Sequence, residues 1–216
     1  MNATRHPLAQ LLHDAAYGVF PPADGVVEVV PSPGPPCDAI VGFTGHFVIA
    51  GDLDADAVAQ RMPPGDFSVP FSPKSLDWLA TTLGLEPATY DALLVTIGTG
   101  AGAPPWLRRV DDLDHPRVDR ASRYRVIESI WTADDDAGLL IVGRGLCGRW
   151  ELGYEVAEDH RGAGLGRRLV AAARRIAPVG EPLWAQVAPG NAASMRSTLA
   201  AGFVPVAAEV LFTRAR

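Results

Sequence analysis

A glycine-rich run, Arg161-Gly162-Ala163-Gly164-Leu165-Gly166, contains the residue types that most directly suggest chemistry. It follows a strand-like segment that ends at Val156, and it opens a helical pattern that begins near Gly164. Residues without side chains let backbone N–H groups approach an anion closely, and a helix N-terminus adds unsatisfied N–H groups and a favourable dipole. The run is therefore predicted to hold a phosphorylated cofactor.

The spacing of these glycines excludes two common nucleotide-binding loops. A P-loop ends in Gly-Lys-Ser/Thr, whereas two arginines follow Gly166. A dinucleotide fingerprint, G-x-G-x-x-G, needs a third glycine where this chain has Arg167, counted from Gly162, or Leu169, counted from Gly164. What remains is an Arg-x-x-Gly-x-Gly pattern.

A second segment downstream supports one interpretation of that pattern. Residues 183–187 are strand-like, Asn191 can cap a helix over 192–201, and Gly202-Phe203 closes it. The Arg-x-x-Gly-x-Gly loop resembles the acyl-CoA pyrophosphate loop of the GNAT N-acetyltransferase superfamily, and the second segment resembles that superfamily's last strand-helix-strand unit. The two motifs occur in the family order.

The resemblance implies an α+β fold. Its central sheet is mostly antiparallel with a splayed strand pair, and helices flank it. We expect an acetyl-CoA-binding domain over residues 89–216 and an N-terminal lobe of unassigned role over residues 1–88. Within that lobe the sequence predicts a strand-like segment over 39–50 and a helix over 73–83 that Ser72 caps.

The resemblance also implies how acetyl-CoA would bind as co-substrate. Its pantetheine arm would run along residues 151–156 and contact backbone groups of Val156 and Glu158. Its pyrophosphate would meet the loop, and Asn191 would touch the cofactor arm. The predicted pyrophosphate contacts are Arg161, Gly162, Gly164, Gly166 and Arg167, and Ala163 is also predicted to bind the cofactor. Either Arg167 or Arg168 would reach the 3′-phosphate, although both residues also suit the solvated face of a helix. For the glycines the alternative is a tight turn that binds no ligand, because such a turn would need the same residues.

The catalytic residues depart from the family pattern. In one branch of the family a glutamate on the later strand acts as base and a tyrosine in the following helix acts as acid. Here those places hold Gln186 and Thr198, and neither titrates usefully near neutral pH. The roles of acid and base therefore do not transfer by position.

Substitutes occur on the preceding strand-like segment. Glu151, Gly153 and Glu155 share one face, and Tyr154 lies on the other. Glu151 is the first candidate for a general base, Glu155 the second, and Tyr154 a candidate acid. A half-exposed sheet face would show the same alternation. His46 and His115 are predicted to have structural roles.

Composition restricts the partners and the compartment. The 216 residues carry a formal net charge of −6, which disfavours nucleic acid as the main partner. No apolar run approaches a membrane span, and the start lacks a signal-peptide layout, so we expect a cytoplasmic protein without a membrane partner. The 2 cysteines have no metal-ligand spacing, and no metal is predicted.

The sequence leaves three functions open. The leading hypothesis is an acetyl-CoA-dependent N-acetyltransferase, an acyltransferase that moves acetyl to a small-molecule or peptide primary amine. Gln186 and Thr198 motivate the alternative of a non-catalytic acyl-CoA binder or sensor. A third hypothesis is an interaction module that binds no cofactor. A homodimer fits any of the three hypotheses.

Overall fold

The computed structural model describes residues 5–133 and 136–214 and divides the chain into two compact units. One unit comprises residues 1–92 and 206–216, and the other comprises residues 93–205. The sequence-based division after residue 88 placed the last strand with the second domain. The structure groups that segment with the first unit instead.

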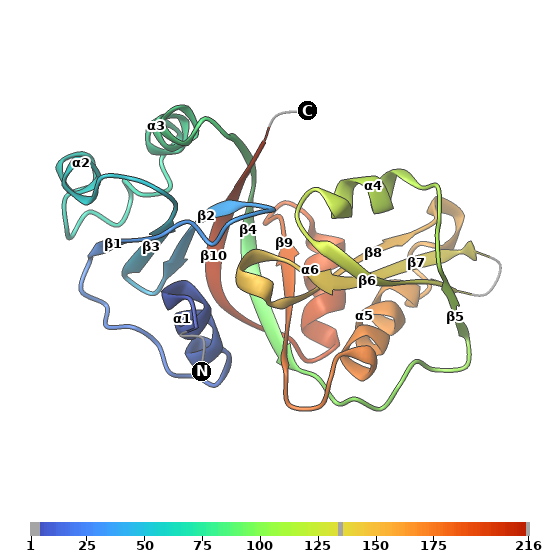
Figure 1. Cartoon of the computed structure of the whole chain (residues 1–216). Coiled ribbons are helices and arrows are strands. Elements are labelled where there is room, and N and C mark those ends of the chain that lie inside the picture. Colours follow the sequence, from blue (N-terminus) through green and yellow to red (C-terminus); the bar gives the residue numbers. More distant parts are fainter. Residues whose placement is uncertain (1–4, 134–135, 215–216) are drawn as a thin grey trace. The chain divides into compact units, whose positions relative to one another are not determined.

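The first unit has strand order β1-β3-β2-β10-β4 in its part of the sheet (Figure 1). β1 pairs with β3 in parallel, whereas β2 is antiparallel to both β3 and β10. The elements that contribute to this unit are α1 (Pro7–Ala16), β1 (Val27–Val30), β2 (Asp38–Phe43), β3 (His46–Ala50), α2 (Ala55–Arg61), α3 (Pro73–Leu83), β4 (Glu86–Ile97) and β10 (Val204–Thr213). The last two strands continue into the second unit.

Local sequence signals explain two features of the first unit. The predicted helix over 73–83 is confirmed, because Ser72 Oγ accepts from the Ser75 N–H at 3.2 Å and Gly84 ends the helix at φ 66°. The predicted single strand over 39–50 is wrong. Residues Thr44 and Gly45 form a turn there, with Gly45 at φ 70°, so the segment folds back as the hairpin β2–β3.

The second unit has strand order β4-β9-β8-β7-β6-β5, and the pairs from β5 to β8 are antiparallel. α4 lies on one side of β6–β8 and α5 on the other (Figure 1). The remaining elements are β5 (Leu107–Val110), α4 (Pro116–Ser122), β6 (Val126–Ala133), β7 (Gly138–Arg144), η2 (Leu146–Gly148), β8 (Trp150–Val156), η3 (Glu158–His160), α5 (Leu165–Ile176), β9 (Pro182–Val187) and α6 (Ala192–Ala200). The short strand β5 was not predicted from the sequence.

β8 and β9 form the splayed pair that the resemblance implied. They are parallel, and their register covers only Trp150 with Leu183 and Glu151 with Trp184. Both strands continue past these residues, so their C-terminal halves run on without ladder pairing. With a mostly antiparallel sheet and flanking helices, the predicted α+β class is confirmed.

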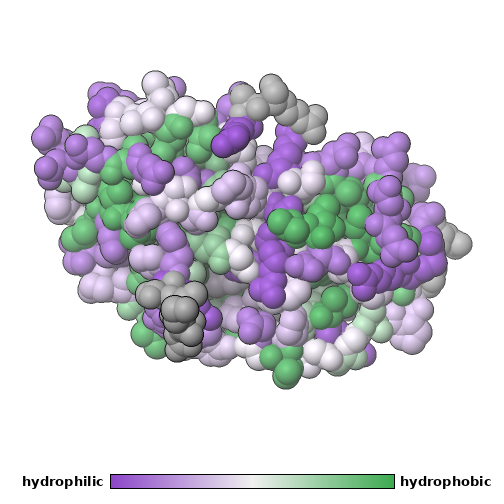
Figure 2. All heavy atoms as spheres, viewed as in Figure 1, coloured by the Kyte–Doolittle hydropathy of each residue, from purple (hydrophilic) through white to green (hydrophobic). Residues whose placement is uncertain are grey.

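Helix α5 buries one apolar face and leaves most of its charged residues exposed. In α5, Leu169 and Val170 are fully buried, whereas Arg167 and Arg168 are exposed. On the face drawn in Figure 2, hydrophobic residues emerge as patches among hydrophilic ones. Across residues 5–133 and 136–214, none of the helices has the length and apolar character needed to cross a bilayer.

Candidate active site

The edge of β8 that faces β9 presents backbone groups at the splay. Gly138 pairs with Val156, and the next N–H, of Ala157, donates to Ala137 O at 2.9 Å. Because backbone groups alternate in direction along an antiparallel strand, Tyr154 and Val156 direct their N–H and C=O groups away from β7. These groups therefore line the gap where pairing with β9 has stopped.

The glycine loop turns the chain from β8 into α5. Gly162 and Gly164 have φ of 80° and 84°, a left-handed conformation that glycine adopts without steric cost. Gly164 is the N-cap of α5, and within the described chain no side chain caps that end. The first N–H groups of α5 are therefore available to an anion.

Two further contacts define the loop. Arg161 Nε donates to Val156 O at 3.2 Å, so an arginine side chain covers one acceptor on the β8 edge. A Cβ at Gly166 would lie 3.2 Å from Tyr154 Cε2 and 3.4 Å from Ser197 Oγ. Glycine at this position therefore lets α5 pack closely against β8 and α6.

The other predicted cofactor residues lie in η3, at the start of α5 and at the start of α6, which packs against α5. Glu158 is exposed in η3, and Asn191 caps α6 by accepting from the Ser194 N–H at 3.0 Å, which confirms the predicted cap. The Arg168 guanidinium stacks over the Trp106 ring at 4.3 Å, whereas Arg167 is exposed at the start of the helix. The cofactor contacts of these residues stay predictions.

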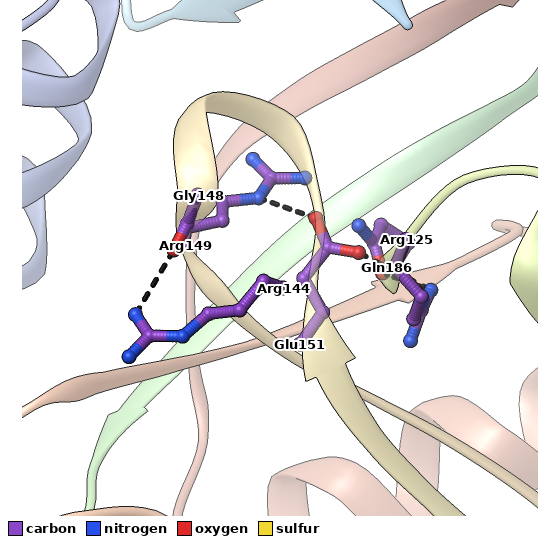
Figure 3. A network of polar contacts seen from close by, with 6 residues as sticks. All are labelled: Arg125, Arg144, Gly148, Arg149, Glu151 and Gln186. Carbon is purple, nitrogen blue, oxygen red and sulfur yellow. Dashed lines mark hydrogen bonds and ion pairs between the residues drawn. The ribbon is translucent and has the colours of Figure 1, made fainter. Parts of the chain in front are cut away.

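A buried ionic cluster occupies the opposite end of β8 (Figure 3). Glu151 has no exposed surface, its Oε1 accepts from Arg149 Nε at 2.7 Å, and its Oε2 lies 3.3 Å from Arg125 Nη2. Burial alone would raise the pKa of Glu151, but the charges of Arg149 and Arg125 outweigh it, so the pKa is lowered. Glu151 is held as a carboxylate between two guanidinium groups.

Neighbouring residues fix the two arginines. Gln186 Oε1, from β9, accepts from Arg125 Nη2 at 3.3 Å, and the Arg149 guanidinium lies 5.5 Å from the centre of the Trp184 ring. Arg144 stacks over Trp150 at 3.7 Å and donates from Nη1 to Gly148 O at 3.1 Å, which ties the turn that carries Arg149 (Figure 3). The cluster therefore joins β8, β9 and the start of β6.

Gly145 is the close neighbour that allows the Glu151 side chain to fit. A Cβ at this position would overlap the Glu151 carboxylate. We expect Gly145→Ala to lower the free energy of unfolding by about 1–3 kcal/mol, because overpacking displaces a carboxylate that cannot leave its partners. Urea unfolding monitored by circular dichroism measures this. Gly190→Ala is the control, because a Cβ there meets no atom within 4 Å. Equal loss in both variants would contradict the proposed crowding at Gly145.

Comparison with known proteins adds to this geometry. The family model described as "Acetyltransferase (GNAT) family" matches residues 104–203. Residues 104–203 belong to the GNAT acetyltransferase family. The match covers both predicted motifs, β8 with its glycine loop and β9 with α6. Curated proteins give no match.

Solved structures of GNAT proteins resemble the chain at low identity. A GNAT-family protein from Novosphingobium aromaticivorans is 20% identical, with a TM-score of 0.43 over 62% of this chain and 69% of that chain. An acetyltransferase from Colwellia psychrerythraea is 11% identical, with a TM-score of 0.39 over 66% and 63%. A GCN5-related N-acetyltransferase from Kribbella flavida is 15% identical, with a TM-score of 0.39 over 65% and 64%. The chain spans less than two thirds of the length of the last two proteins.

The predicted catalytic residues of this GNAT domain lie in three different environments. Glu151 is enclosed, as described above, whereas Glu155 is exposed four residues further along β8 on the same face. Tyr154 is half-buried on the other face, where its ring packs against Gly166. Thr198, at the family's acid position, has no exposed surface, and its Oγ1 has no hydrogen-bond partner within the described residues.

Sequence reasoning missed the arginines that organise the GNAT domain. Arg149 directly precedes β8 in extended conformation, two residues before Glu151, so their same-face pairing was visible in the sequence. Arg125 lies 26 residues from Glu151 along the chain and meets it only through the fold. No local signal identifies that contact. His115 has the structural role predicted for it, because its Nδ1 accepts from the Arg117 N–H at 3.0 Å and caps α4.

Proposed function

We propose that this chain is an acetyl-CoA-dependent N-acetyltransferase that moves an acetyl group to a primary amine by direct attack on the thioester. One observation carries the proposal. Among the described residues, the C-terminal half of β8, with the backbone groups of Tyr154 and Val156, has no ladder pairing with β9, and it leads through η3 into a glycine loop whose helix N-terminus has no side-chain cap. Amides of a pantetheine arm complement such an edge, and a pyrophosphate complements such a helix end.

The residues present fit acetyl-CoA as donor substrate. Val156 and Glu158 supply backbone groups to pantetheine, and Arg161 can exchange its hydrogen bond to Val156 O for the pyrophosphate. The pyrophosphate meets the amides of Gly162, Ala163, Gly164, Gly166 and Arg167. Asn191, next to this loop in the family pattern, contacts the cofactor arm while it caps α6.

Transfer requires a neutral amine, so a base must first take a proton from the ammonium group. We assign this role to Glu155, which is exposed on β8, and not to Glu151. A base must reach the substrate, and the Glu151 carboxylate is enclosed by two arginines and has a lowered pKa. Glu151 is instead a positioning residue that holds Arg125 and Arg149.

The remaining steps are formation of the new amide bond and release of CoA, and Tyr154 on β8 can take part in the second. The amine nitrogen forms a bond to the acetyl carbon, backbone N–H groups stabilise the oxyanion, and the C–S bond then breaks. The departing thiolate receives the second proton of the amine nitrogen, by way of solvent or the Tyr154 hydroxyl. Gln186 and Thr198 cannot act as general base or general acid, because neither side chain titrates near neutral pH.

The donor site is tested by Gly164→Ala. The φ of 84° at Gly164 costs an L-residue about 1–2 kcal/mol, so the loop is expected to change conformation and the Kd for acetyl-CoA to rise about tenfold. Isothermal titration calorimetry measures the change. Gly84→Ala is the matched control, because Gly84 is also left-handed, at φ 66°, and lies at the end of α3 in the first unit. An unchanged Kd in Gly164→Ala would contradict the loop assignment.

The transfer itself is tested by measuring CoA release with acetyl-CoA and a panel of primary amines. Amine-dependent release above the hydrolytic background is the expected result. The non-catalytic acyl-CoA binder is the second candidate, favoured by Gln186, which the structure ties to Arg125, and by the buried Thr198. Binding of acetyl-CoA by calorimetry, without release on any amine, would support the binder and contradict the enzyme.

A further inference from the structure

Two guanidinium groups approach the same point on the face of β8 that carries Glu151 and Glu155. A Cβ at Gly153 would lie 3.3 Å from Arg117 Nη2 and 3.6 Å from Arg125 Nη1. Arg117 comes from α4, and Arg125 lies just before β6. Because Gly153 shares its face with Glu151 and Glu155, this point lies between the enclosed carboxylate and the exposed one.

Several N–H groups of these two arginines are buried but unused. Within residues 5–133 and 136–214, no hydrogen-bond partner is present for Arg125 Nε, Arg125 Nη1 or Arg117 Nε. The Arg125 side chain is 9% exposed, and only its Nη2 has partners, Gln186 and Glu151. Buried guanidinium N–H groups without partners are costly, and an anion would satisfy them.

The charges around the two arginines also favour a bound anion. Burial lowers the pKa of Arg117, and repulsion from Arg125 and Arg120 lowers it further, whereas the charge of Glu155 acts in the opposite direction. Two cations are therefore held close together in a half-desolvated place. A bound anion would relieve that repulsion.

We propose that Arg117 and Arg125, with Gly153 between them, bind a carboxylate on the amine acceptor. Guanidinium groups bind carboxylates through paired N–H donors, and the missing side chain at Gly153 leaves room for the oxygens. Glu155, two residues along the same strand face, then faces the ammonium end of the acceptor. An acceptor with both groups, an α-amino acid or a peptide with a nearby carboxylate, matches this pairing of charges. This inference rests on the proposed function, because only a transferase would bind the carboxylate as part of an amine acceptor.

Binding is tested first, without turnover. ¹⁵N-labelled protein with CoA is titrated with N-acetylglycine and, separately, with N-acetylglycinamide, while the Nε–H signals of arginine are recorded. The carboxylate is expected to shift the Arg117 and Arg125 signals, which Arg117→Gln and Arg125→Lys assign, and the amide is expected to shift neither. Equal effects of both compounds, or no effect of either, would overturn the proposal.

Turnover is tested next, as the ratio of kcat/KM for glycine, alanine and phenylalanine to that for the corresponding amides. We expect a ratio of at least tenfold in the unchanged protein, falling to about onefold to twofold in Arg117→Gln. Gly153→Ala retains both charges but places a methyl group between them, and it is expected to lower the ratio as well. Arg120→Gln, exposed on the same helix, is the control and should keep the ratio.

The binding titration and the turnover measurement together distinguish this inference from the proposed function. If no amine is acetylated but the carboxylate still shifts the two arginine signals, the anion site stands and the transferase proposal fails. If amines and amino acids are acetylated equally well, the transferase stands and the carboxylate site is overturned. Preferential acetylation of O-phosphoethanolamine would assign the site to a phosphate group and also overturn it.

Discussion

Replacing Glu151 with glutamine is expected to lower the free energy of unfolding by about 3–5 kcal/mol, because the change leaves Arg125 and Arg149 facing a neutral amide. Glutamine has nearly the same volume as glutamate, so the effect reports lost charge and not a cavity. Urea unfolding, followed by tryptophan fluorescence, measures it. Glu181→Gln, an exposed glutamate before β9, is the control and should change stability by less than about 0.5 kcal/mol.

The pH dependence of that loss follows from the lowered pKa of Glu151. A carboxyl group whose pKa is depressed in the folded state adds stability that is fully present above its unfolded pKa, about 4.3. That stability is lost as the pH falls through the folded pKa. The difference between the unchanged protein and Glu151→Gln should therefore be constant from about pH 7 to pH 5 and shrink on further acidification. A difference that grows in acid would contradict the ionic cluster.

Replacing Glu155 with glutamine is expected to lower kcat about 10²- to 10⁴-fold, because the variant cannot take the proton of the acceptor ammonium. The side chain is exposed, so folding stability and the Kd for acetyl-CoA should remain within error of the unchanged protein. Steady-state CoA release, calorimetry and thermal unfolding measure the three quantities. The Glu181→Gln variant should retain full activity.

The substitutions at Glu155 and Glu151 are expected to affect different properties of the protein. Loss of turnover with normal stability is expected at Glu155, whereas loss of stability is expected at Glu151. Full activity of Glu155→Gln would remove Glu155 as base. A folded, slow Glu151→Gln variant whose kcat alone is reduced would return that role to Glu151.

The sequence predicted the parts of this molecule that depend on local rules. Trp150–Val156 is a strand, Asn191 caps α6, and Gly164 begins α5, because alternation, capping and left-handed glycine act over a few residues. The hairpin at Gly45 was missed because a continuous apolar run does not show where a strand turns. The resemblance to the GNAT family was predicted from motif spacing and not from propensity, and the family model that matches residues 104–203 confirms it.

The candidate site was less predictable than the fold, for a physical reason. Alternation correctly placed Glu151 and Glu155 on one face of β8, but it says nothing of what covers each residue. Arg125 encloses Glu151 from a distant part of the chain, and Arg117 reaches the same face from α4. Burial by such non-local partners changes a candidate base into a positioning residue. Only the folded arrangement distinguishes two glutamates that are equivalent in sequence.

The most direct test of the donor site is a titration of ¹⁵N-labelled protein with acetyl-CoA, observed through backbone N–H signals. We predict large shifts at Tyr154, Val156 and Gly164, where the unpaired edge of β8 meets the glycine loop, and small shifts across β5 at the other end of that sheet order. Saturating acetyl-CoA that leaves these three signals unmoved would contradict the assignment of this edge and loop to the donor substrate.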